Sequence, residues 1–441
     1  MNAPLAIHDW TSLDEPGRAA LLRRPSQRDA AGLSARAAAI VADVRARGDA
    51  AVREYTAKFD GVDLDSLAVA PAEFEAATAT LTREQLAALR RAIETVTRFH
   101  ETQSLEPVRL QTVPGVTCER LMVPIGAVGL YVPAGSAPLP STAVMLAVPA
   151  RLARCPVRVL CTPPRPDGRA DPAVLVVAKL CGIEQVYKVG GAQAIAAMAY
   201  GTATIPKVDK IYGPGNAWVT AAKQVVAADA DGAALDMPAG PSEVLVIADD
   251  AAEPAFVAAD LLAQAEHSPD AQVVLVALSR PFAEACAVEV ARQLEALPRR
   301  EIAGAAIGSS RILLVPDLET ALEVSNRYAP EHLILQVRAP RRWLDRVRNA
   351  GSVFLGAWTP ETLGDYCSGT NHVLPTYGHA RAYSGLGVLD FVRRMTVQEA
   401  TPEGLADLGP VARTLAKLES LEAHARAVEV RLEALESESR T

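Results

Sequence analysis

Short apolar runs that are typical of strands alternate with helical runs of about ten to fifteen residues between residues 118 and 376, and no other feature constrains the fold as strongly. Strands joined by such helices form βαβ units, whose strands lie parallel in one sheet. The first series of expected strands is Ala127–Val132, Val157–Cys161, Gln185–Val189 and Asp209–Tyr212. After the loop at 236–242 the series begins again, with strands expected at Glu243–Ala248, Gln272–Leu278, Ile312–Val315 and the run after His332. The sequence therefore predicts an α/β fold with two similar βαβ-type domains, which are incomplete Rossmann-like parallel sheets.

The same pattern divides the chain into four expected parts. Pro4, Pro16 and Pro25 predict an irregular stretch to about residue 30, and helical runs follow it. Beyond about Tyr377 the alternation is lost, and one strongly helical segment is expected from Pro410 to about residue 438. A C-terminal arm of that kind often packs on a partner subunit. The expected parts are 1–117 (N-terminal arm and helical region), 118–238 (first α/β domain), 239–376 (second α/β domain) and 377–441 (C-terminal helical arm).

The composition indicates a globular protein that does not bind polyanions. Half of the 441 residues are apolar and 22% are charged, which is enough to fill the cores of about three domains. The formal net charge of −8 argues against a nucleic-acid or anionic-membrane surface. The first ten residues show no signal-peptide pattern, and no apolar run approaches the roughly 18 residues of a membrane helix. The six cysteines form no Cys-x-x-Cys pair, which is typical of reduced, mostly buried thiols in a cytoplasmic protein.

A carboxylate and an imidazole stand side by side in Tyr328-Ala-Pro-Glu331-His332-Leu, at the start of an apolar run. The residue before a proline is biased towards extended geometry, so we expect Glu331 and His332 on a turn that enters a strand. Adjacent side chains on an extended segment point in different directions, which favours two groups that serve one site over a single ion pair. A strand-edge histidine beside a solvated glutamate is the structural alternative.

Four further residues are candidate metal ligands. Gln264 and His267 are three apart at the end of an expected helix, so both can reach one ion. Asp365 lies in a loop of small polar residues, and His424 is near Glu419 in the helical tail. Imidazole, carboxylate and amide donors together suit a borderline cation such as Zn²⁺ that keeps positions open for substrate. Taken alone, each of these residues is more often an ordinary surface or core residue.

A dinucleotide-binding fingerprint, G-x-G-x-x-G after a strand, is absent. The nearest segment, Gly213-Pro-Gly215-Asn-Ala-Trp218, has an indole in place of the third glycine. Gly190-Gly191 and Gly213-Pro-Gly215 nevertheless precede helices, where backbone N–H groups can bind a phosphate. Ordinary strand-to-helix turns explain these glycines equally well.

Seven segments follow one another in a recognisable order. They are Tyr131-Val-Pro-Ala-Gly135, Gly190-Gly-Ala-Gln193-Ala-Ile, Tyr212-Gly-Pro-Gly-Asn216, Ala239-Gly-Pro-Ser242-Glu-Val, Gln264-Ala-Glu-His267, Tyr328-Ala-Pro-Glu331-His332-Leu, and Gly364-Asp365-Tyr366 through Asn371-His-Val-Leu-Pro375. Together they resemble histidinol dehydrogenase, over about residue 30 to the C-terminus. The resemblance implies a zinc-dependent, four-electron dehydrogenase that oxidises L-histidinol to L-histidine through L-histidinaldehyde with two NAD⁺, as the last step of histidine biosynthesis.

The resemblance also implies a homodimer with one Zn²⁺ per subunit and an active site shared between subunits. By position, His332 would be the general base and Glu331 would activate water. Tyr131, Gln193 and Asn216 would bind NAD⁺. The implied zinc ligands are Gln264, His267, Asp365 and His424. The implied substrate-binding residues are Ser242, Gln264, His267, Glu331, His332, Asp365, Glu419 and His424, the last two supplied by the partner subunit.

Two features of this sequence complicate the assignment of these roles by position. Family members usually have Pro-Gly-Gly where this chain has Pro133-Ala134-Gly135, so Ala134 requires a negative φ and no contact between its methyl group and a ligand backbone. Glu419 and His424 are five apart, which is about 140° around a helix with 3.6 residues per turn. Both can reach one site if the helix begins or breaks between them.

Other functions fit part of the sequence. A zinc hydrolase would use Glu331 to activate water but would leave the first α/β domain without a task. A metal-stabilised scaffold or small-molecule binding protein would require Glu331 and His332 to be inert. Within the resembling family, a paralogue would oxidise another amino or sulfonated alcohol. The presence of all four candidate zinc ligands favours a substrate that bears an imidazole.

Overall fold

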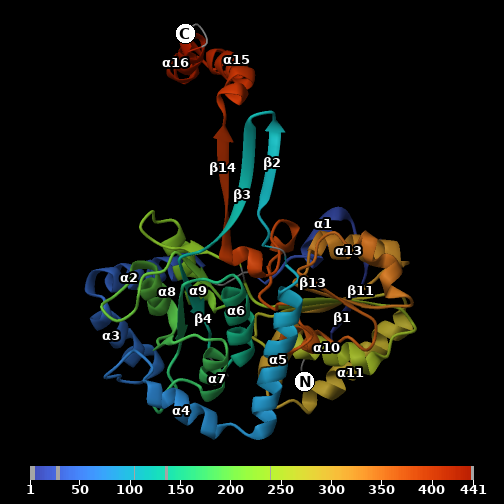
Figure 1. Cartoon of the computed structure of the whole chain (residues 1–441). Coiled ribbons are helices and arrows are strands. Elements are labelled where there is room, and N and C mark those ends of the chain that lie inside the picture. Colours follow the sequence, from blue (N-terminus) through green and yellow to red (C-terminus); the bar gives the residue numbers. More distant parts are fainter. Residues whose placement is uncertain (1–4, 26–29, 104, 135–137, 239, 439–441) are drawn as a thin grey trace. The chain divides into compact units, whose positions relative to one another are not determined.

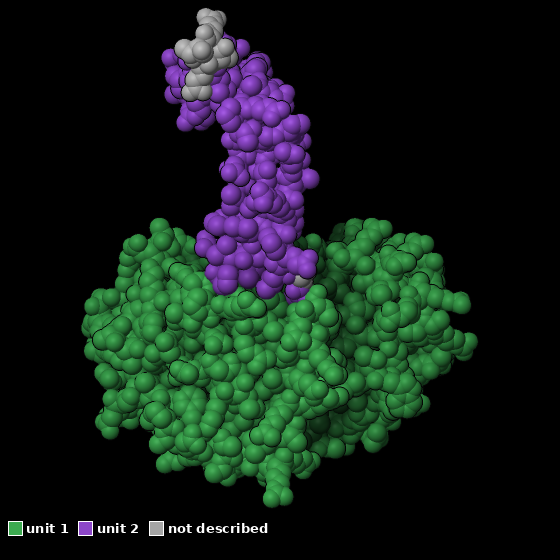
Figure 2. Space-filling view, in the orientation of Figure 1, with its two compact units in different colours: residues 1–102, 125–391 green, residues 103–124, 392–441 purple. Residues whose placement is uncertain are grey.

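The computed structural model describes residues 5–25, 30–103, 105–134, 138–238 and 240–438, so Gly135 and Ala239 of the resembling segments lie outside the described residues. The chain divides into two compact units, which Figure 2 shows in different colours. The first unit comprises Met1–Thr102 with Ile125–Phe391, and the second comprises Gln103–Pro124 with Val392–Thr441.

The first sheet of the first unit has five parallel strands in the order β6-β5-β4-β7-β8, of which Figure 1 labels β4. Its strands are β4 (Ala127–Tyr131), β5 (Val157–Thr162), β6 (Gln185–Lys188), β7 (Lys210–Tyr212) and β8 (Ala234–Leu235). The helices that alternate with them are α6 (Pro140–Leu152), α7 (Pro172–Leu180), α8 (Gly191–Tyr200) and α9 (Ala217–Ala227). Four earlier helices pack on this layer: α2 (Ala30–Arg47), α3 (Asp49–Asp60), α4 (Pro71–Thr80) and α5 (Arg83–His100).

The second sheet has six parallel strands in the order β1-β11-β10-β9-β12-β13. Its strands are β1 (Ala6–Asp9), β9 (Glu243–Ala248), β10 (Gln272–Ala277), β11 (Arg311–Leu314), β12 (His332–Gln336) and β13 (Ser352–Leu355). Every residue of β9, β10 and β12 is buried, as expected for parallel strands covered on both faces. The helices of this half are α1 (Glu15–Leu21), α10 (Pro254–Ala265), α11 (Arg280–Glu295), α12 (Arg300–Gly308), α13 (Leu318–Tyr328) and α14 (Glu361–Tyr366).

The second unit combines an antiparallel sheet with two helices. Its strands, in the order β14-β3-β2, are β14 (Val392–Ala400), β3 (Val116–Pro124) and β2 (Val108–Val113). Helices α15 (Pro402–Leu418) and α16 (Glu422–Glu438) pack closely, because Gly409 on α15 leaves room for Leu432 and Val428. A methyl group at Gly409 would lie 3.1 Å from Leu432 and 3.2 Å from Val428.

The predicted α/β fold with two parallel sheets is confirmed, whereas three local expectations are wrong. The N-terminal stretch is not irregular at Ala6–Asp9, which forms the edge strand β1. Strands β2, β3 and β14 were missed; their residues are exposed or half-buried on both faces, so the apolar residues they contain do not form a buried face. The tail is two helices, which Ser420 separates with a left-handed φ of 60°. The four-part division of the chain stays a prediction.

The cysteines agree with the expectation from their spacing. All six are free, and four of them are buried. Burial raises the pKa of Cys155 and Cys181 to about 11, so these thiols stay protonated at neutral pH. Within the described residues, no helix is both long enough and apolar enough to cross a membrane.

Candidate active site

The Glu331–His332 pair lies where helix α13 ends and strand β12 begins. Ala329 ends α13 in the left-handed conformation, with φ 54° and ψ 68°. This residue precedes Pro330, and the extended conformation that the proline predicted for it is wrong. The helix cap overrides the proline bias, because the Ala329 N–H donates to the Ser325 carbonyl at 2.7 Å. The turn still makes His332 the first residue of β12, between β9 and β13. The left-handed conformation of an alanine is unfavourable by roughly 1 kcal/mol, so the backbone beside the candidate site is strained.

The His332 ring has a defined tautomer. Its Nδ1 lies 3.2 Å from the backbone carbonyl oxygen of Glu243, which can only accept a hydrogen bond, so Nδ1 carries the proton. The other nitrogen, Nε2, is buried without a hydrogen-bond partner among the described residues, 3.6 Å from Asp365 Oδ1. Burial lowers the pKa of His332 to about 3, so the imidazole is neutral in the free protein. His332 thus presents an unshared electron pair on Nε2.

Glu331 is buried beside His332 but is not its ion-pair partner. Its Oε2 accepts a hydrogen bond from the Glu243 backbone N–H at 2.9 Å and lies 3.7 Å from His332 Nδ1. Burial raises the pKa of Glu331 well above its ordinary value, although the Glu243 N–H opposes that rise. Since His332 is neutral, the two side chains are separate groups, each hydrogen-bonded to one backbone group of Glu243.

Glu243 is itself held from the side opposite to its backbone contacts. Arg24 makes a bidentate pair with it, Nε to Oε2 at 2.5 Å and Nη2 to Oε1 at 2.9 Å, and the Tyr328 hydroxyl donates to Oε2 at 3.0 Å. Arg24 also donates to the Tyr328 carbonyl at 2.8 Å, and its guanidinium lies 4.0 Å from the centroid of that ring. The sequence did not point to Glu243 or Arg24, because their contacts join segments that are far apart along the chain.

A cluster of metal-type ligands lies next to this pair. Ligand atoms of His267, Glu361 and Asp365 all lie within 4.8 Å of one another. His267 follows the C-terminal end of α10, while Glu361 and Asp365 are one turn apart on α14. Sequence reasoning missed Glu361, although its four-residue spacing from Asp365 places both carboxylates on one helix face.

The cluster fits a divalent cation. Burial raises the pKa of Asp365 to about 7, and burial plus the charges of Asp365 and Glu331 raises that of Glu361 well above its usual range. A cation would remove this penalty by stabilising the ionised carboxylates. The buried amide of Gln264 faces Glu361 Oε1, where it either donates through its nitrogen or, with a cation between them, presents its oxygen as a ligand. The imidazole, amide and carboxylate donors of this cluster are those that Zn²⁺ accepts.

The other expected site residues are distributed over both units. Ser242 directly precedes Glu243 at the start of β9. His372, which was not among the expected site residues, donates from Nδ1 to the Asp365 carbonyl at 2.7 Å and so holds the end of α14. Glu419 is the C-terminal cap of α15 and His424 lies in α16, so the helix does break between them. Both belong to the second unit, and their part in the site stays a prediction.

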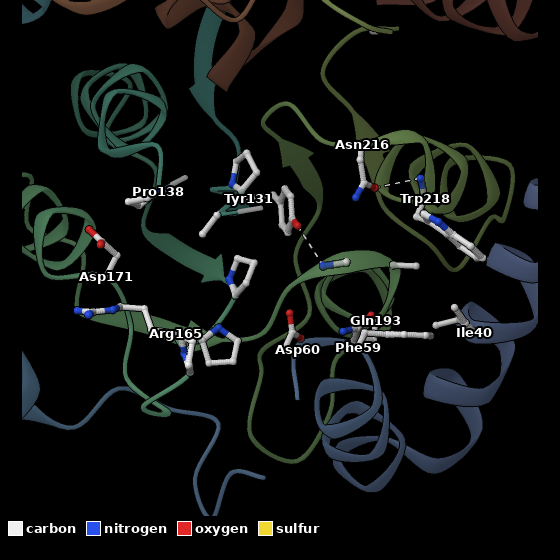
Figure 3. A pocket seen from close by; sticks show the side chains of 17 residues that line it. Ile40, Phe59, Asp60, Tyr131, Pro138, Arg165, Asp171, Gln193, Asn216 and Trp218 are labelled. Carbon is white, nitrogen blue, oxygen red and sulfur yellow. Dashed lines mark hydrogen bonds between the residues drawn. The ribbon is translucent and has the colours of Figure 1, made fainter. Parts of the chain in front are cut away.

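The three expected NAD⁺ contacts line one cavity of about 680 Å³ in the first half of the first unit (Figure 3). Tyr131 ends β4, and its hydroxyl accepts a hydrogen bond from the Gly191 N–H at 3.0 Å. The Asn216 Oδ1 caps helix α9 by accepting from the N–H groups of Trp218 at 3.1 Å and Val219 at 3.2 Å, which leaves its Nδ2 for a ligand. Gln193 completes the set. A volume of this size suits a nucleotide-sized ligand.

Ala134, where family members usually have glycine, lines this cavity. It is not among the described non-glycine residues that have a positive φ, so the backbone condition for its methyl group is met. The effect of this methyl group on NAD⁺ binding stays a prediction. The cavity lies at the carboxyl ends of β4, β5 and β6, which is the usual ligand edge of an open parallel sheet.

A nucleotide-sized cavity on one parallel sheet and a neutral imidazole beside metal-type ligands on the other are the parts that an α/β oxidoreductase with a nucleotide cofactor and a metal ion requires. The histidinol dehydrogenase family model matches residues 22–432. A histidinol dehydrogenase of Xanthomonas euvesicatoria pv. vesicatoria is 57% identical over 428 residues, which are 97% of this chain and 99% of that protein. One from Vibrio parahaemolyticus is 54% identical over 426 residues, 97% and 98% of the two chains.

Solved structures agree with the sequence comparison. The crystal structure of histidinol dehydrogenase from Elizabethkingia anophelis has a TM-score of 0.93 at 44% identity, covering 98% of this chain and 99% of that one. The chain belongs to the histidinol dehydrogenase family. Its activity is the NAD⁺-dependent oxidation that completes histidine biosynthesis, and the family uses NAD⁺ and Zn²⁺. The predictions of family, activity and both cofactors are confirmed.

Proposed function

We propose that the chain takes L-histidinol to L-histidine through L-histidinaldehyde with two NAD⁺, and that Glu331 and His332 carry the protons of the two steps. The observation that supports this most directly is the His332 hydrogen bond to the Glu243 carbonyl, because it leaves Nε2 as a base beside the ligand cluster. A base in this place is what oxidation of an alcohol requires.

In the first step, the substrate hydroxyl gives its proton to His332 Nε2 while a hydride leaves the same carbon for NAD⁺. Ionised Asp365, 3.6 Å from Nε2, stabilises the imidazolium as it forms. In the second step, water adds to the aldehyde carbon and gives a proton to Glu331, and a second hydride leaves that carbon. One alcohol, one water and two NAD⁺ thus give one carboxylate, two NADH and three protons.

Gln264, His267 and Asp365 are the proposed zinc ligands of this subunit, with Glu361 as a further carboxylate within reach. When bound, Zn²⁺ supplies a Lewis acid that orients and polarises the donor atoms of the substrate. Ser242 is proposed to contact the substrate from the start of β9. Tyr131, Gln193 and Asn216 are proposed to bind NAD⁺, since all three line one cavity.

The active form is proposed to be a homodimer in which the partner subunit's Glu419 and the partner subunit's His424 complete the site. Helix α15 supports this, because Leu408, Val411, Leu415 and Leu418 recur at helical spacing and are 37%, 53%, 55% and 77% exposed. A second copy of the chain is the proposed cover for this apolar stripe. The free thiols support the proposed cytoplasmic location.

The activity is tested on protein stripped with a chelator and then reloaded with Zn²⁺. We expect zinc-restored turnover with two NADH formed per L-histidinol. The His332→Asn variant should bind Zn²⁺ and yet lack turnover, whereas His379→Asn, at an exposed histidine, should behave as the wild type. Loss of zinc together with activity would place His332 among the metal ligands. Zinc binding without NADH formation would overturn the proposed substrate.

A site shared between two subunits can be tested by mixing two inactive variants. His332→Asn and His424→Ala variants are each expected to be inactive. Mixing them under conditions that exchange subunits should restore activity, because a heterodimer then contains one site with both native residues. Absence of recovery, with heterodimers demonstrated by mass spectrometry, would refute a site shared between subunits.

A further inference from the structure

Asp60 is a carboxylate in the first-sheet cavity, and one of its two oxygens is buried without a partner in the described part of the chain. It is the last residue of α3, directly before Gly61, whose φ of 70° ends the helix. It lines the cavity together with Phe59 (Figure 3). Its Oδ2 is buried and has no hydrogen-bond partner among the described residues. No sequence motif marks this residue.

The position of Asp60 is electrostatically unfavourable in the free protein. The C-terminal end of a helix carries partial negative charge, which repels a carboxylate. Burial raises the pKa of Asp60 to about 6, and no neighbouring cation opposes this rise. A buried polar atom without a partner calls for a role other than stabilising the fold.

A second unpartnered acceptor lines the same cavity. The Oε1 of Gln193, whose side chain is almost fully buried, also has no hydrogen-bond partner in the described part of the chain. Two orphan acceptors in one cavity indicate a ligand that brings donors. NAD⁺ brings ribose hydroxyls, and a carboxylate is the group that dinucleotide-binding folds place against a ribose 2′-hydroxyl.

The cavity is placed for the adenosine half of the cofactor. The residues that line it in the described chain all lie between Ile40 and Trp218, so the metal-ligand cluster of the second sheet contributes none of them. The nicotinamide must reach the reacting carbon beside that cluster, which leaves the remote half of NAD⁺ for the cavity. Ile40, Phe59 and Trp218 offer apolar surfaces for a base.

We propose that Asp60 binds the 2′-hydroxyl of the adenosine ribose and thereby makes the protein select NAD⁺ over NADP⁺. NADP⁺ has a phosphate in place of this hydroxyl. The phosphate has no hydroxyl to donate to Asp60, and its negative charge would be repelled by the carboxylate. Arg165 also lines the cavity, and a guanidinium binds phosphate, so exclusion of NADP⁺ depends on Asp60. This inference rests on the proposed location of NAD⁺ in the cavity.

The test measures binding of NAD⁺, 2′-deoxy-NAD⁺ and NADP⁺ by calorimetry to the zinc-loaded protein. Asp60→Asn should bind NAD⁺ about tenfold more weakly, because the amide oxygen can still accept the ribose hydrogen bond but lacks the charge that strengthens it. The wild type should lose more affinity than the variant when 2′-deoxy-NAD⁺ replaces NAD⁺, since the stronger hydrogen bond is the one that the analogue removes. NADP⁺ should bind the variant more tightly than the wild type.

The matched control is Asp63→Asn, which removes the same charge from an exposed side chain three residues away, outside the cavity lining. It should bind all three nucleotides as the wild type does. Thermal unfolding separates binding from folding, because Asp60→Asn removes an unfavourable charge and should melt at the same temperature or higher. A lower melting temperature would assign Asp60 a structural role and overturn the inference.

The outcomes also separate this inference from the proposed function. If Gln193→Ala weakens NAD⁺ binding while Asp60→Asn and the 2′-deoxy analogue bind normally, NAD⁺ occupies the cavity but Asp60 does not hold its ribose. If neither variant changes NAD⁺ binding, the cavity is not the cofactor site. Either result refutes the role of Asp60.

Discussion

Replacing Arg24 with methionine tests whether the buried Arg24–Glu243 pair holds the turn that carries Glu331 and His332. Methionine keeps an unbranched apolar side chain and removes only the guanidinium. The side chain of Arg24 is 12% exposed and that of Glu243 is 2% exposed, so the substitution leaves a carboxylate in the interior with the Tyr328 hydroxyl as its remaining side-chain partner.

Removing one member of a buried ion pair costs about 3–5 kcal/mol, because the other charge stays buried and unpaired. We expect a loss of this size in the free energy of unfolding from urea titration, followed with two spectroscopic probes. The double variant Arg24→Met/Glu243→Met should recover much of it, since both charges are gone. The exposed pair of Arg47 with Asp43 provides the control, and Arg47→Met should have little effect.

Turnover should fall as well, because the backbone of Glu243 orients both Glu331 and His332. The double variant separates the two effects: it should be stable but still slow, because the side chain that anchors this peptide is absent. The reasoning is refuted if Arg24→Met unfolds within about 1 kcal/mol of the wild type, or if the double variant is less stable than the single one.

Three further predictions follow from the site and its surroundings. Glu331→Gln should slow oxidation of L-histidinaldehyde more than that of L-histidinol in single-turnover assays, and equal slowing would contradict its role towards water. Glu361→Gln should weaken Zn²⁺ binding about tenfold or more in competition with a chelator, and unchanged affinity would remove Glu361 from the metal site. Burial raises the pKa of Asp260 from 3.8 to about 6, so its protonated form is favoured by folding and this contribution to stability is lost as pH rises through about 6. Asp260→Asn should therefore stabilise the protein more at about pH 8 than at about pH 4 in urea unfolding, and a constant difference would contradict that pKa shift.

The sequence predicted the two parallel sheets because buried strands and their connecting helices leave strong apolar patterns. It also predicted the turn that brings Glu331 and His332 into β12, although for a wrong local reason, since Ala329 is left-handed. It could not reveal Glu243, whose part depends on its backbone N–H and carbonyl groups rather than on its side-chain type. Backbone contacts of this kind leave no pattern in a single sequence.

The cavity lies at the carboxyl ends of the strands of its sheet, whereas the ligand cluster lies at the amino ends of the strands of the other sheet. The sequence did not indicate this difference. The cavity follows the rule that ligands bind at the carboxyl ends of parallel strands. Glu243 and His332, in contrast, are the first residues of β9 and β12, so the ligand cluster lies at the amino ends of the second sheet. Helix α10 runs back to that edge and places Gln264 at its C-terminal end. The same rule applied to both sheets would have misplaced the candidate metal site.

The edge strand β1 has a consequence for how the protein forms during synthesis. Ala6 pairs with Arg311, so 305 residues separate the partners along the chain, the difference between 311 and 6. At about 5–20 residues per second, a ribosome needs roughly 15–60 s to supply β11 after β1 has been made. The first segment of the chain must therefore wait unpaired while the first sheet folds. The sheet that carries Glu331 and His332 can therefore be completed only late in synthesis.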